Sequence, residues 1–486
     1  MGWERGMNMK YIDQIKHFVM GVVLVSYIYL WCCRLWFEND YVTFIIQIPF
    51  LLVFPLNIYL LWIKKDEIFK MFRYYVMRNK LIFISIVLFV FYDVITIFYA
   101  MKISYLSTKY IMFFRTLYVI GSLFLCCYDS ERNKRGKNIK FLIQCICCIL
   151  VTFAVTTIIR FSLGMSPYWE RVSLRADYNV YARYFLFCLA FYIFHYIKSE
   201  SHYSGIYKVL YLICGIVSCD LIFLTASRRA IVLGILIVTF SSFFYIIKRK
   251  WKLNFKHLIF FVALVGNLVL SIPMFEKHVS TMSEEKKYMH MNFMSGNTPE
   301  EQNDDKFHGI SEAGLSTRYE TIGREEGLAT RRPIWNVSIE AIKQFKIQEI
   351  LFGKGNGYAW NVYENMDDEN VVKLLELYKD MEEPEPQWMT PHNFFLTEVL
   401  EGGLLKIILV MFLGIVLGYS LIQYIPLNVE CGFMLLTIYV CLGANFLLGS
   451  TNGLLGEDLF WLTTGILILL RSNEDIDKNI VIKNKE

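Results

Sequence analysis

Hydrophobic positions along the chain gather in long continuous runs that are separated by short polar breaks. A helix that crosses about 30 Å of hydrocarbon needs roughly 20 mostly apolar residues. The runs do not alternate with a period of two, which favours helices over a membrane barrel. The pattern predicts about twelve membrane-spanning helices, at 18–36, 41–63, 81–101, 108–128, 140–162, 181–197, 205–226, 230–247, 257–275, 393–423, 426–448 and 454–471.

The fold class that follows is all-α, a polytopic membrane helix bundle with one large polar loop that contains amphipathic helices. Of the 486 residues, 55% are hydrophobic, which is more apolar surface than a water-soluble core absorbs. We expect nine spanning helices in 1–275, the large loop in 276–391, three more helices in 392–471 and a tail in 472–486. The first apolar run is followed by FEND, so no cleavable signal peptide is expected.

The distribution of Lys and Arg residues predicts the orientation, because positively charged short loops stay on the cytoplasmic side. With the N-terminus inside, the cytoplasmic segments hold 25 Lys and Arg and the short outside loops hold 7. Both termini should therefore be cytoplasmic. The segment 276–391 is then extracytoplasmic, and it holds 22 of the 44 Asp and Glu residues. A polar insertion of this length predicts a functional cap.

Several kinds of chemistry are disfavoured. All twelve cysteines lie in apolar runs and none in the polar loop, which indicates small buried hydrophobes rather than disulfides or a metal site. The chain has no GxxxxGK[ST], no HExxH and no paired CxxC motifs, which disfavours nucleotide hydrolysis and structural zinc. We expect neither a metal nor a cofactor, and no nucleic-acid partner.

Two pairs of arginines stand at predicted helix starts. Arg228 and Arg229 lie in TASRRA, in a tight break between two membrane helices, and Arg331 and Arg332 lie in TRRPIW, which opens a helix of the polar loop. A guanidinium is a rigid, always charged fork that suits phosphate or pyrophosphate. The alternatives are arginines that anchor helix ends by snorkelling, for the first pair, and solvated charge at a loop start, for the second.

The loop segment that follows Arg332 is predicted to be an amphipathic helix with a glycine turn after it. Trp335, Ile339, Ile342 and Phe345 recur at helical spacing and should face one side. The glycine turn is FGKGNGY. A second loop helix is predicted around ENVVKLLELYKDM, before the proline-rich EPEPQ.

His392 stands where the polar loop re-enters the bilayer, in TPHNFFLTEVLEGGLLK. A histidine there can exchange a proton near neutral pH or donate a hydrogen bond to a sugar hydroxyl. Asn393 is expected to orient it, with Glu398 and Glu401 deeper along the helix. The alternative is an interfacial histidine with a structural role.

A further outside loop carries Arg175, Tyr178 and Asn179 beside the aromatic residues Tyr168 and Trp169. Aromatic faces next to hydrogen-bonding groups suit sugar rings, and an aromatic belt at the membrane interface is the alternative. Ionisable residues inside or next to apolar runs are functional candidates or buried ion-pair partners. These are Arg34, Asp93, Arg115, Arg183, Glu457 and Asp458.

The order of these motifs resembles the bacterial O-antigen ligase and polymerase superfamily. TASRRA is similar to its Ser-Arg element, TRRPIW to its Arg-x-x-x-Trp element, FGKGNGY to its Gly-x-Gly turn, PHNFFLTEVLEGG to its His-Asn element and RADYNVYA to an Asn-bearing segment. Together they span roughly 170–410. The chain departs from the ligase pattern at Lys406, where a small residue or tyrosine would be preferred.

The resemblance implies inverting, metal-independent transfer of a glycan from undecaprenyl pyrophosphate to a sugar hydroxyl, in the bacterial cytoplasmic membrane. Carried over by position, Arg228 and Arg331 would hold the pyrophosphate leaving group and His392 would orient or deprotonate the acceptor. Second-rank candidates for substrate binding are Arg229, Arg332, Arg175, Asn179, Asn393, Tyr178 and Trp335.

Three functions remain open at this point. The first is a polymerase that joins lipid-linked repeat units of a capsule, exopolysaccharide or O-antigen, with a flippase and a chain-length regulator among its expected partners. The second is an O-antigen ligase or O-oligosaccharyltransferase, which moves a finished glycan to lipid A or protein. The third is a transporter or lipid flippase, although transporters typically have related halves and interrupted helices near the midplane.

Overall fold

A computed structural model describes residues 2–32, 40–100, 106–162, 178–199, 205–225, 227–248, 331–360, 391–449 and 453–483, together with 262, 266 and 362. Every regular element in these ranges is a helix, which confirms the all-α prediction. The chain divides into two compact units. The first unit comprises Met1–Ile63 and Leu125–Ile322, and the second comprises Lys64–Phe124 and Gly323–Glu486.

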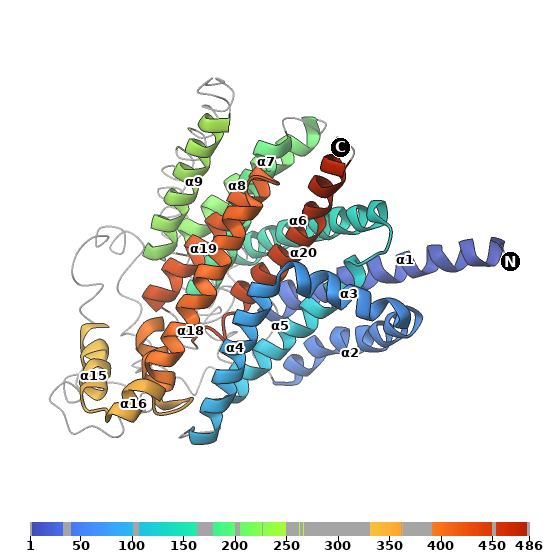
Figure 1. Cartoon of the computed structure of the whole chain (residues 1–486). Coiled ribbons are helices and arrows are strands. Elements are labelled where there is room, and N and C mark those ends of the chain that lie inside the picture. Colours follow the sequence, from blue (N-terminus) through green and yellow to red (C-terminus); the bar gives the residue numbers. More distant parts are fainter. Residues whose placement is uncertain are drawn as a thin grey trace. The chain divides into compact units, whose positions relative to one another are not determined.

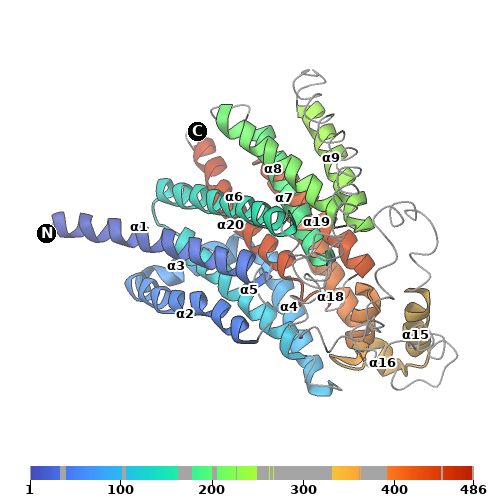
Figure 2. The ribbon, with the colours of Figure 1, turned by 180° about the vertical axis from the view of Figure 1, so that it is seen from behind.

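The first unit is built around α7 (Tyr178–Ser199). Almost every residue of 181–197 is buried, because α7 packs against both α8 and α9 (Figures 1 and 2). The helices of this unit are α1 (Gly2–Leu24), a π-helical turn (Val25–Cys32), α2 (Asp40–Ile63), α6 (Arg132–Ser162), α7, α8 (Gly205–Leu224) and α9 (Arg228–Lys248).

The second unit has α4 and α18 side by side (Figure 1). Outside the polar loop its helices are α3 (Lys65–Arg78), α4 (Lys80–Ile95), a 3₁₀ turn (Thr96–Tyr99), α5 (Leu106–Cys127, whose last three residues belong to the first unit), α18 (Phe394–Tyr424), α19 (Val429–Gly449) and α20 (Asp458–Lys483). The polar loop adds α15 (Arg331–Lys343), α16 (Ile347–Phe352) and a 3₁₀ turn (Tyr358–Trp360).

Described helices overlap eleven of the twelve predicted ranges, although α1 begins at Gly2, well before the predicted start at 18, and the range 257–275 lies outside the described residues except for 262 and 266. Five helices are long and apolar enough to cross a membrane by themselves, and there are up to six candidate spans if one bent pair counts as a single span. This search covered the described residues only.

Residues 65–78 differ from the prediction. They were counted among the positively charged cytoplasmic segments and no helix was predicted there, whereas they form α3. The segment KDEIFKMFRYYVMR has acidic residues in its first turn and Arg78 in its last, which complements the helix dipole. A search for long apolar runs does not detect this helix, because it carries many charged residues and too few apolar ones to span a membrane.

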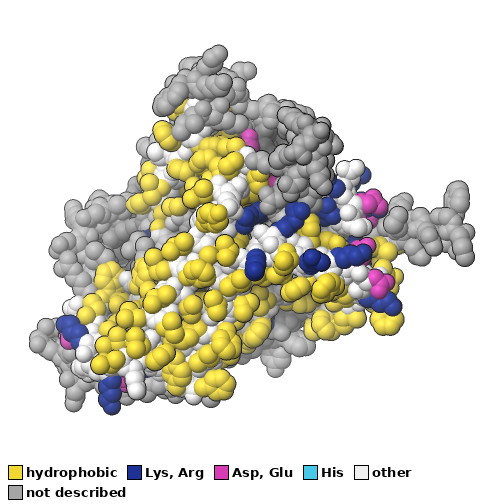
Figure 3. Space-filling model, viewed as in Figure 1, with side chains coloured by type: hydrophobic (Ala, Val, Ile, Leu, Met, Phe, Trp, Pro, Cys, Tyr) yellow, Lys and Arg dark blue, Asp and Glu magenta, His cyan; other side chains and the backbone are white. Residues whose placement is uncertain are grey.

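The apolar surface of the second unit runs along α4 and α18. Exposed side chains include Val87 and Phe91 on α4, and Ile408 and Ile415 on α18. Figure 3 shows apolar side chains gathered over these two helices. Because a soluble protein would not leave such a face open to water, this surface is suited to lipid.

Helix α18 is broken near its start. Gly403 has φ 65° and ψ −165°, which separates the segment 394–402 from the long apolar remainder. Only glycine adopts this conformation readily. The short first segment therefore has its own direction, and it is the segment that His392 precedes.

Candidate functional site

A hydrogen bond joins the helix that starts at Arg331 to the residue before His392. The indole Nε1 of Trp335 donates to the carbonyl oxygen of Pro391 at 2.8 Å. Trp335 lies one turn into α15, so the start of α15 is held close to the His392 segment. The structure thus brings together two of the motifs that the sequence singled out.

The buried face formed by α15 and the residues after it agrees in part with the predicted one, because Phe345 is buried and Ile342 packs against the same core. Ile334, Val337 and Ala341 are buried, whereas Ile339 is 41% exposed and Trp335 is half-buried. The prediction was therefore wrong for Ile339, and it left out Ile334, Val337 and Ala341, which face the core.

The core beneath this helix comes from the glycine turn and from α18. Tyr358, Ala359 and Leu400 pack with the buried face of α15 and with Phe345, and Ile342 packs at its edge. The loop helix is therefore seated on both the FGKGNGY turn and the first segment of α18. The second predicted loop helix, around 364–381, lies outside the described residues.

His392 has an unusual backbone conformation. Its φ is 46°, and among the described residues it is the one residue other than glycine with a positive φ. Such a conformation costs of order 1–3 kcal/mol and is kept where the surroundings impose it, often at active sites. Asn393 is the N-cap of α18, because its side-chain oxygen accepts a hydrogen bond from Leu396 N at 3.2 Å. Its observed contact is to the helix start and not to the imidazole.

The glycine turn and the break in α18 touch backbone to backbone. Gly353, Gly355 and Gly403 all have positive φ. A Cβ at Gly353 would lie 2.4 Å from the carbonyl carbon of Glu401, and one at Gly355 would lie 2.4 Å from the carbonyl oxygen of Tyr99. These approaches leave no room for side chains, which explains the run of glycines in FGKGNGY and EGG.

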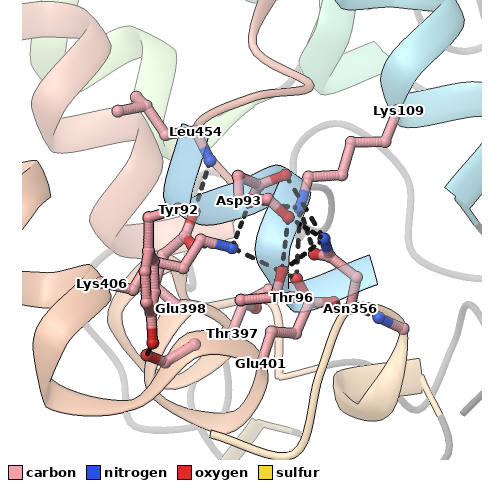
Figure 4. Close-up of polar contacts among 12 residues, drawn as sticks. Tyr92, Asp93, Thr96, Lys109, Asn356, Thr397, Glu398, Glu401, Lys406 and Leu454 are labelled. Carbon is pink, nitrogen blue, oxygen red and sulfur yellow. Dashed lines mark hydrogen bonds and ion pairs between the residues drawn. The ribbon is translucent and has the colours of Figure 1, made fainter. Parts of the chain in front are cut away.

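Five ionisable side chains from three helices meet next to this contact (Figure 4). They are between 0 and 7% exposed, and we call them the charge cluster: Asp93 of α4, Lys109 of α5, and Glu398, Glu401 and Lys406 of α18.

Lys406 forms ion pairs with all three carboxylates of the charge cluster. Its Nζ lies 2.6 Å from Asp93 Oδ1, 2.7 Å from Glu398 Oε2 and 3.7 Å from Glu401 Oε2. Charges this deeply buried are tolerated only when they are paired. The departure from the ligase pattern at this position therefore has a structural reason, since a neutral residue would leave three carboxylates facing one another with Lys109 alone.

Lys109 completes the charge cluster from α5. Its Nζ lies 3.4 Å from Asp93 Oδ1 and 3.3 Å from Glu401 Oε2, and it donates to Asn356 Oδ1 at 2.9 Å. The sequence interpretation placed Lys109 among the charges of an outside loop. Its side chain is buried and paired in α5 rather than exposed in a loop, and the side of the membrane on which it lies stays a prediction.

The polar loop takes part in the charge cluster through Asn356 and its neighbour. Asn356 is fully buried, and its Nδ2 lies 3.0 Å from Asp93 O and 2.7 Å from Thr96 Oγ1. The next amide, Gly357 N, donates to Glu401 Oε1 at 3.0 Å. Glu398 Oε1 accepts from Leu454 N at 2.6 Å, which adds the segment before α20.

Sequence reasoning named Asp93, Glu398 and Glu401 but could not pair them, and it gave Lys109 and Asn356 no role in the site. The available signal was that charges inside apolar runs must find partners. Which charges pair depends on the packing of helices about 300 residues apart.

The two arginine pairs stand at helix starts, as predicted. Helix α9 begins at Arg228 and α15 at Arg331, and neither has an acidic residue in its first turn. Arg229 is half-buried, and the side chains of Arg228, Arg331 and Arg332 lie outside the described ones. Because α9 belongs to the first unit and α15 to the second, the meeting of Arg228 with His392 stays a prediction.

The remaining candidates are described in part or not at all. Tyr178 and Asn179 open α7, but their side chains are not described, and Arg175 lies outside the described residues, as do Tyr168 and Trp169. Among the described residues no group of His, Cys, Asp and Glu side chains could hold a metal ion. The ten cysteines whose side chains the structure describes are free thiols.

These helices define a multi-pass membrane protein, with a polar loop clamped onto membrane helices beside a strained histidine. Residues 212–411 match the model of the O-antigen ligase family. The match covers less than half of the chain, and it supports the resemblance to the O-antigen ligase and polymerase superfamily that was drawn from the motifs. A search of curated proteins finds no match. Arg228, Arg331 and His392 all lie within the matched residues, and the family acts on lipid-linked glycans as a membrane glycosyltransferase.

Proposed function

We propose that the protein is a polysaccharide polymerase that joins undecaprenyl-pyrophosphate-linked repeat units at the extracytoplasmic face of the bacterial cytoplasmic membrane. The observation that carries the proposal is the hydrogen bond from Trp335 to Pro391, which ties the helix start bearing Arg331 to the segment bearing His392. A phosphate-binding group and a proton acceptor are needed together in glycosyl transfer from a pyrophosphate.

The helix starts support an anionic ligand. The first N–H groups of a helix are unsatisfied and carry partial positive charge, so two arginines added there repel the dipole unless an anion is present. Arg228 and Arg331 stand at such starts without a nearby acidic residue in the first turn. A pyrophosphate would satisfy the N–H groups and the guanidiniums together.

The reaction is a displacement at the anomeric carbon of the donor glycan. The acceptor sugar hydroxyl attacks from the face opposite the pyrophosphate, which inverts the configuration. The new bond joins the acceptor oxygen to the anomeric carbon, and the bond from that carbon to the pyrophosphate oxygen breaks. His392 takes the hydroxyl proton, and Arg228 and Arg331 stabilise the charge that develops on the leaving pyrophosphate.

Other residues would bind the glycans. Arg229 and Arg332 would assist with the pyrophosphate, and Arg175, Tyr178 and Asn179 would line the acceptor side. Trp335 and Asn393 would border the space beside His392. No metal or cofactor takes part in the proposed reaction.

The proposal includes a topology of about twelve crossings with both termini in the cytoplasm. Residues 276–391 would form the extracytoplasmic loop between nine helices in 1–275 and three in 392–471, with 472–486 as a cytoplasmic tail. A flippase that delivers lipid-linked units and a regulator of chain length would be its partners, since a polymerase needs a supply of units and a limit.

The second candidate is a ligase or O-oligosaccharyltransferase that transfers a finished glycan to lipid A or protein. The family match favours either reaction equally. Lys406, which is built into the charge cluster here, departs from the ligase pattern and favours the polymerase. A transporter or lipid flippase is the third candidate, and it would need no proton acceptor at the membrane surface.

The test is to mix the purified protein in detergent with lipid-pyrophosphate-linked repeat units and to separate the products by size. A ladder of longer lipid-linked glycans is expected. Transfer to lipid A or protein without a ladder would replace the polymerase by a ligase, and no transfer at all would contradict both.

Variants test the assigned residues in the same assay. Arg228→Ala, Arg331→Ala and His392→Ala should each lower the rate at least about 100-fold, the usual effect of removing a group that stabilises charge or moves a proton. Arg73→Ala is the matched control, because Arg73 is an exposed arginine on α3. Equal losses in the control would remove the assignment.

A further inference from the structure

The charge cluster contains more charged side chains than the packing of α4, α5 and α18 requires. Its three carboxylates and two ammonium groups carry a formal charge of −1 when all are ionised. A packed apolar contact of the same volume would be at least as stable as a buried ion network. The charge cluster therefore calls for a reason other than stability.

One such reason is that ion pairs and hydrogen bonds fix direction, whereas apolar packing does not. Glu401 accepts from Gly357 N, and Asn356 contacts Asp93 and Lys109 at once. Each of these contacts joins the polar loop to a membrane helix. The glycine turn can therefore occupy one position only with respect to α4 and α18.

The parts fixed in this way carry the proposed active groups. The first segment of α18 contains Glu398 and Glu401 and is preceded by His392. The glycine turn supports the buried face of α15 through Tyr358 and Ala359. A shift at Asn356 would therefore move the start of α15 and the imidazole relative to each other.

We propose that Asn356 and the charge cluster are positioning elements, which set the geometry between the start of α15 and His392 by locking the FGKGNGY turn to α4, α5 and α18. None of these residues touches the substrate in this inference, which rests on the proposed function. Their contribution is to hold the phosphate-binding and proton-accepting groups in register, and a displacement of about 1 Å can cost 100-fold in rate.

The experiment is a double-mutant cycle on the rate of glycan transfer. Asn356→Ala removes the side-chain hydrogen bonds to Lys109 and Asp93. Trp335→Phe removes the indole N–H that donates to Pro391 O and keeps an aromatic ring. Each single variant should lower kcat about 10-fold or more, with KM for the donor changed less than about 2-fold. The double variant should lose about as much as the worse single variant, since both act on one geometry.

The matched control is Gln348→Ala, which removes an exposed carboxamide from α16 in the same loop and should keep the wild-type kcat. All rates are normalised to the folded fraction, measured by thermal unfolding in detergent. Because Asn356→Ala removes a fully buried group, Lys109→Arg is a second test that keeps the charge and changes the donor geometry.

The outcomes distinguish a failure of the proposed function from a failure of the positioning role. An inactive wild-type protein contradicts the proposed function. An active wild-type protein whose Asn356→Ala and Lys109→Arg variants keep wild-type kcat contradicts this inference alone. Losses in the double variant that multiply also contradict it, since two independent structural defects would give that result.

Discussion

Gly353 and Gly403 approach each other so closely that neither can carry a side chain. A Cβ built on Gly403 would lie 2.6 Å from the backbone nitrogen of Gly353 and 2.5 Å from the carbonyl carbon and oxygen of Leu351. The glycine turn of the polar loop and the break in α18 are thus in direct backbone contact.

The first prediction concerns this contact. Gly403→Ala should unfold the protein at a lower temperature and lower its transfer activity, because φ is 65° and the added methyl group overlaps the backbone. Strain of this kind alone costs of order 1–3 kcal/mol. Thermal unfolding in detergent measures the change.

Gly418→Ala serves as its control, because it lies on the same helix with nothing within 4 Å of its Cβ position. It should be neutral or slightly stabilising, since Ala favours helix. Equal unfolding temperatures for the two variants would contradict the observed backbone contact.

The second prediction concerns the charge balance around Lys406. Lys406→Met should destabilise the protein by about 3–5 kcal/mol, because it leaves buried carboxylates without their main partner. Replacing Glu398 by Gln in addition should recover part of the loss. Chemical or thermal unfolding of the single and double variants measures both effects.

Lys343→Met is the comparison for this series, since Lys343 forms a surface pair with Glu340 and its side chain is 64% exposed. Its expected effect is below about 1 kcal/mol. If Lys406→Met were as mild as this variant, the ion pairs of Lys406 would not be important for stability.

The third prediction separates the backbone of His392 from its chemistry. His392→Asn should fold like the wild type, because Asn also tolerates positive φ, and it should lose transfer activity, because a carboxamide accepts no proton. The wild-type rate should fall below about pH 6, where imidazole becomes protonated. An unchanged rate at low pH, or an active Asn variant, would rule out the role of base.

The fourth prediction concerns topology. Fusion of a reporter that is active only outside the cytoplasm should give signal after residue 300 and none after residue 483, as the Lys and Arg distribution requires. A fluorescent protein that matures only in the cytoplasm should give the opposite pattern. If residues 300 and 483 gave signal with the same type of reporter, the proposed orientation would be wrong.

The sequence allowed the all-helical fold class and the family resemblance to be predicted, because runs of apolar residues and positioned Arg, Gly and His residues are local features. The count of about twelve spans stays a prediction, since five or six candidate spans are found among the described residues. It did not predict α3, whose charges hide its helical character. It also placed Ile339 on the buried face of α15, where this side chain is exposed, and it left out the small residue Ala341, which is buried.

The charge cluster could not be predicted as a unit, for a different reason. Asp93 and Lys109 precede Glu398, Glu401 and Lys406 by about 300 residues, and pairing at that separation depends on which helices pack together. Local patterns contain no information about this packing. The role of Asn356 could not be predicted either, because an asparagine in a glycine turn usually forms hydrogen bonds within the turn.

The same separation has a consequence for how the protein is made. During synthesis at 5–20 residues per second, roughly 15–60 s pass between the emergence of Lys109 and that of Lys406. During this interval Asp93 and Lys109 have only each other as ion-pair partners within the charge cluster, because α18 is not yet made. A ribosome that stops before α18 would therefore leave a lone Asp93–Lys109 ion pair, without the further partners that α18 and the polar loop supply and that a buried pair needs.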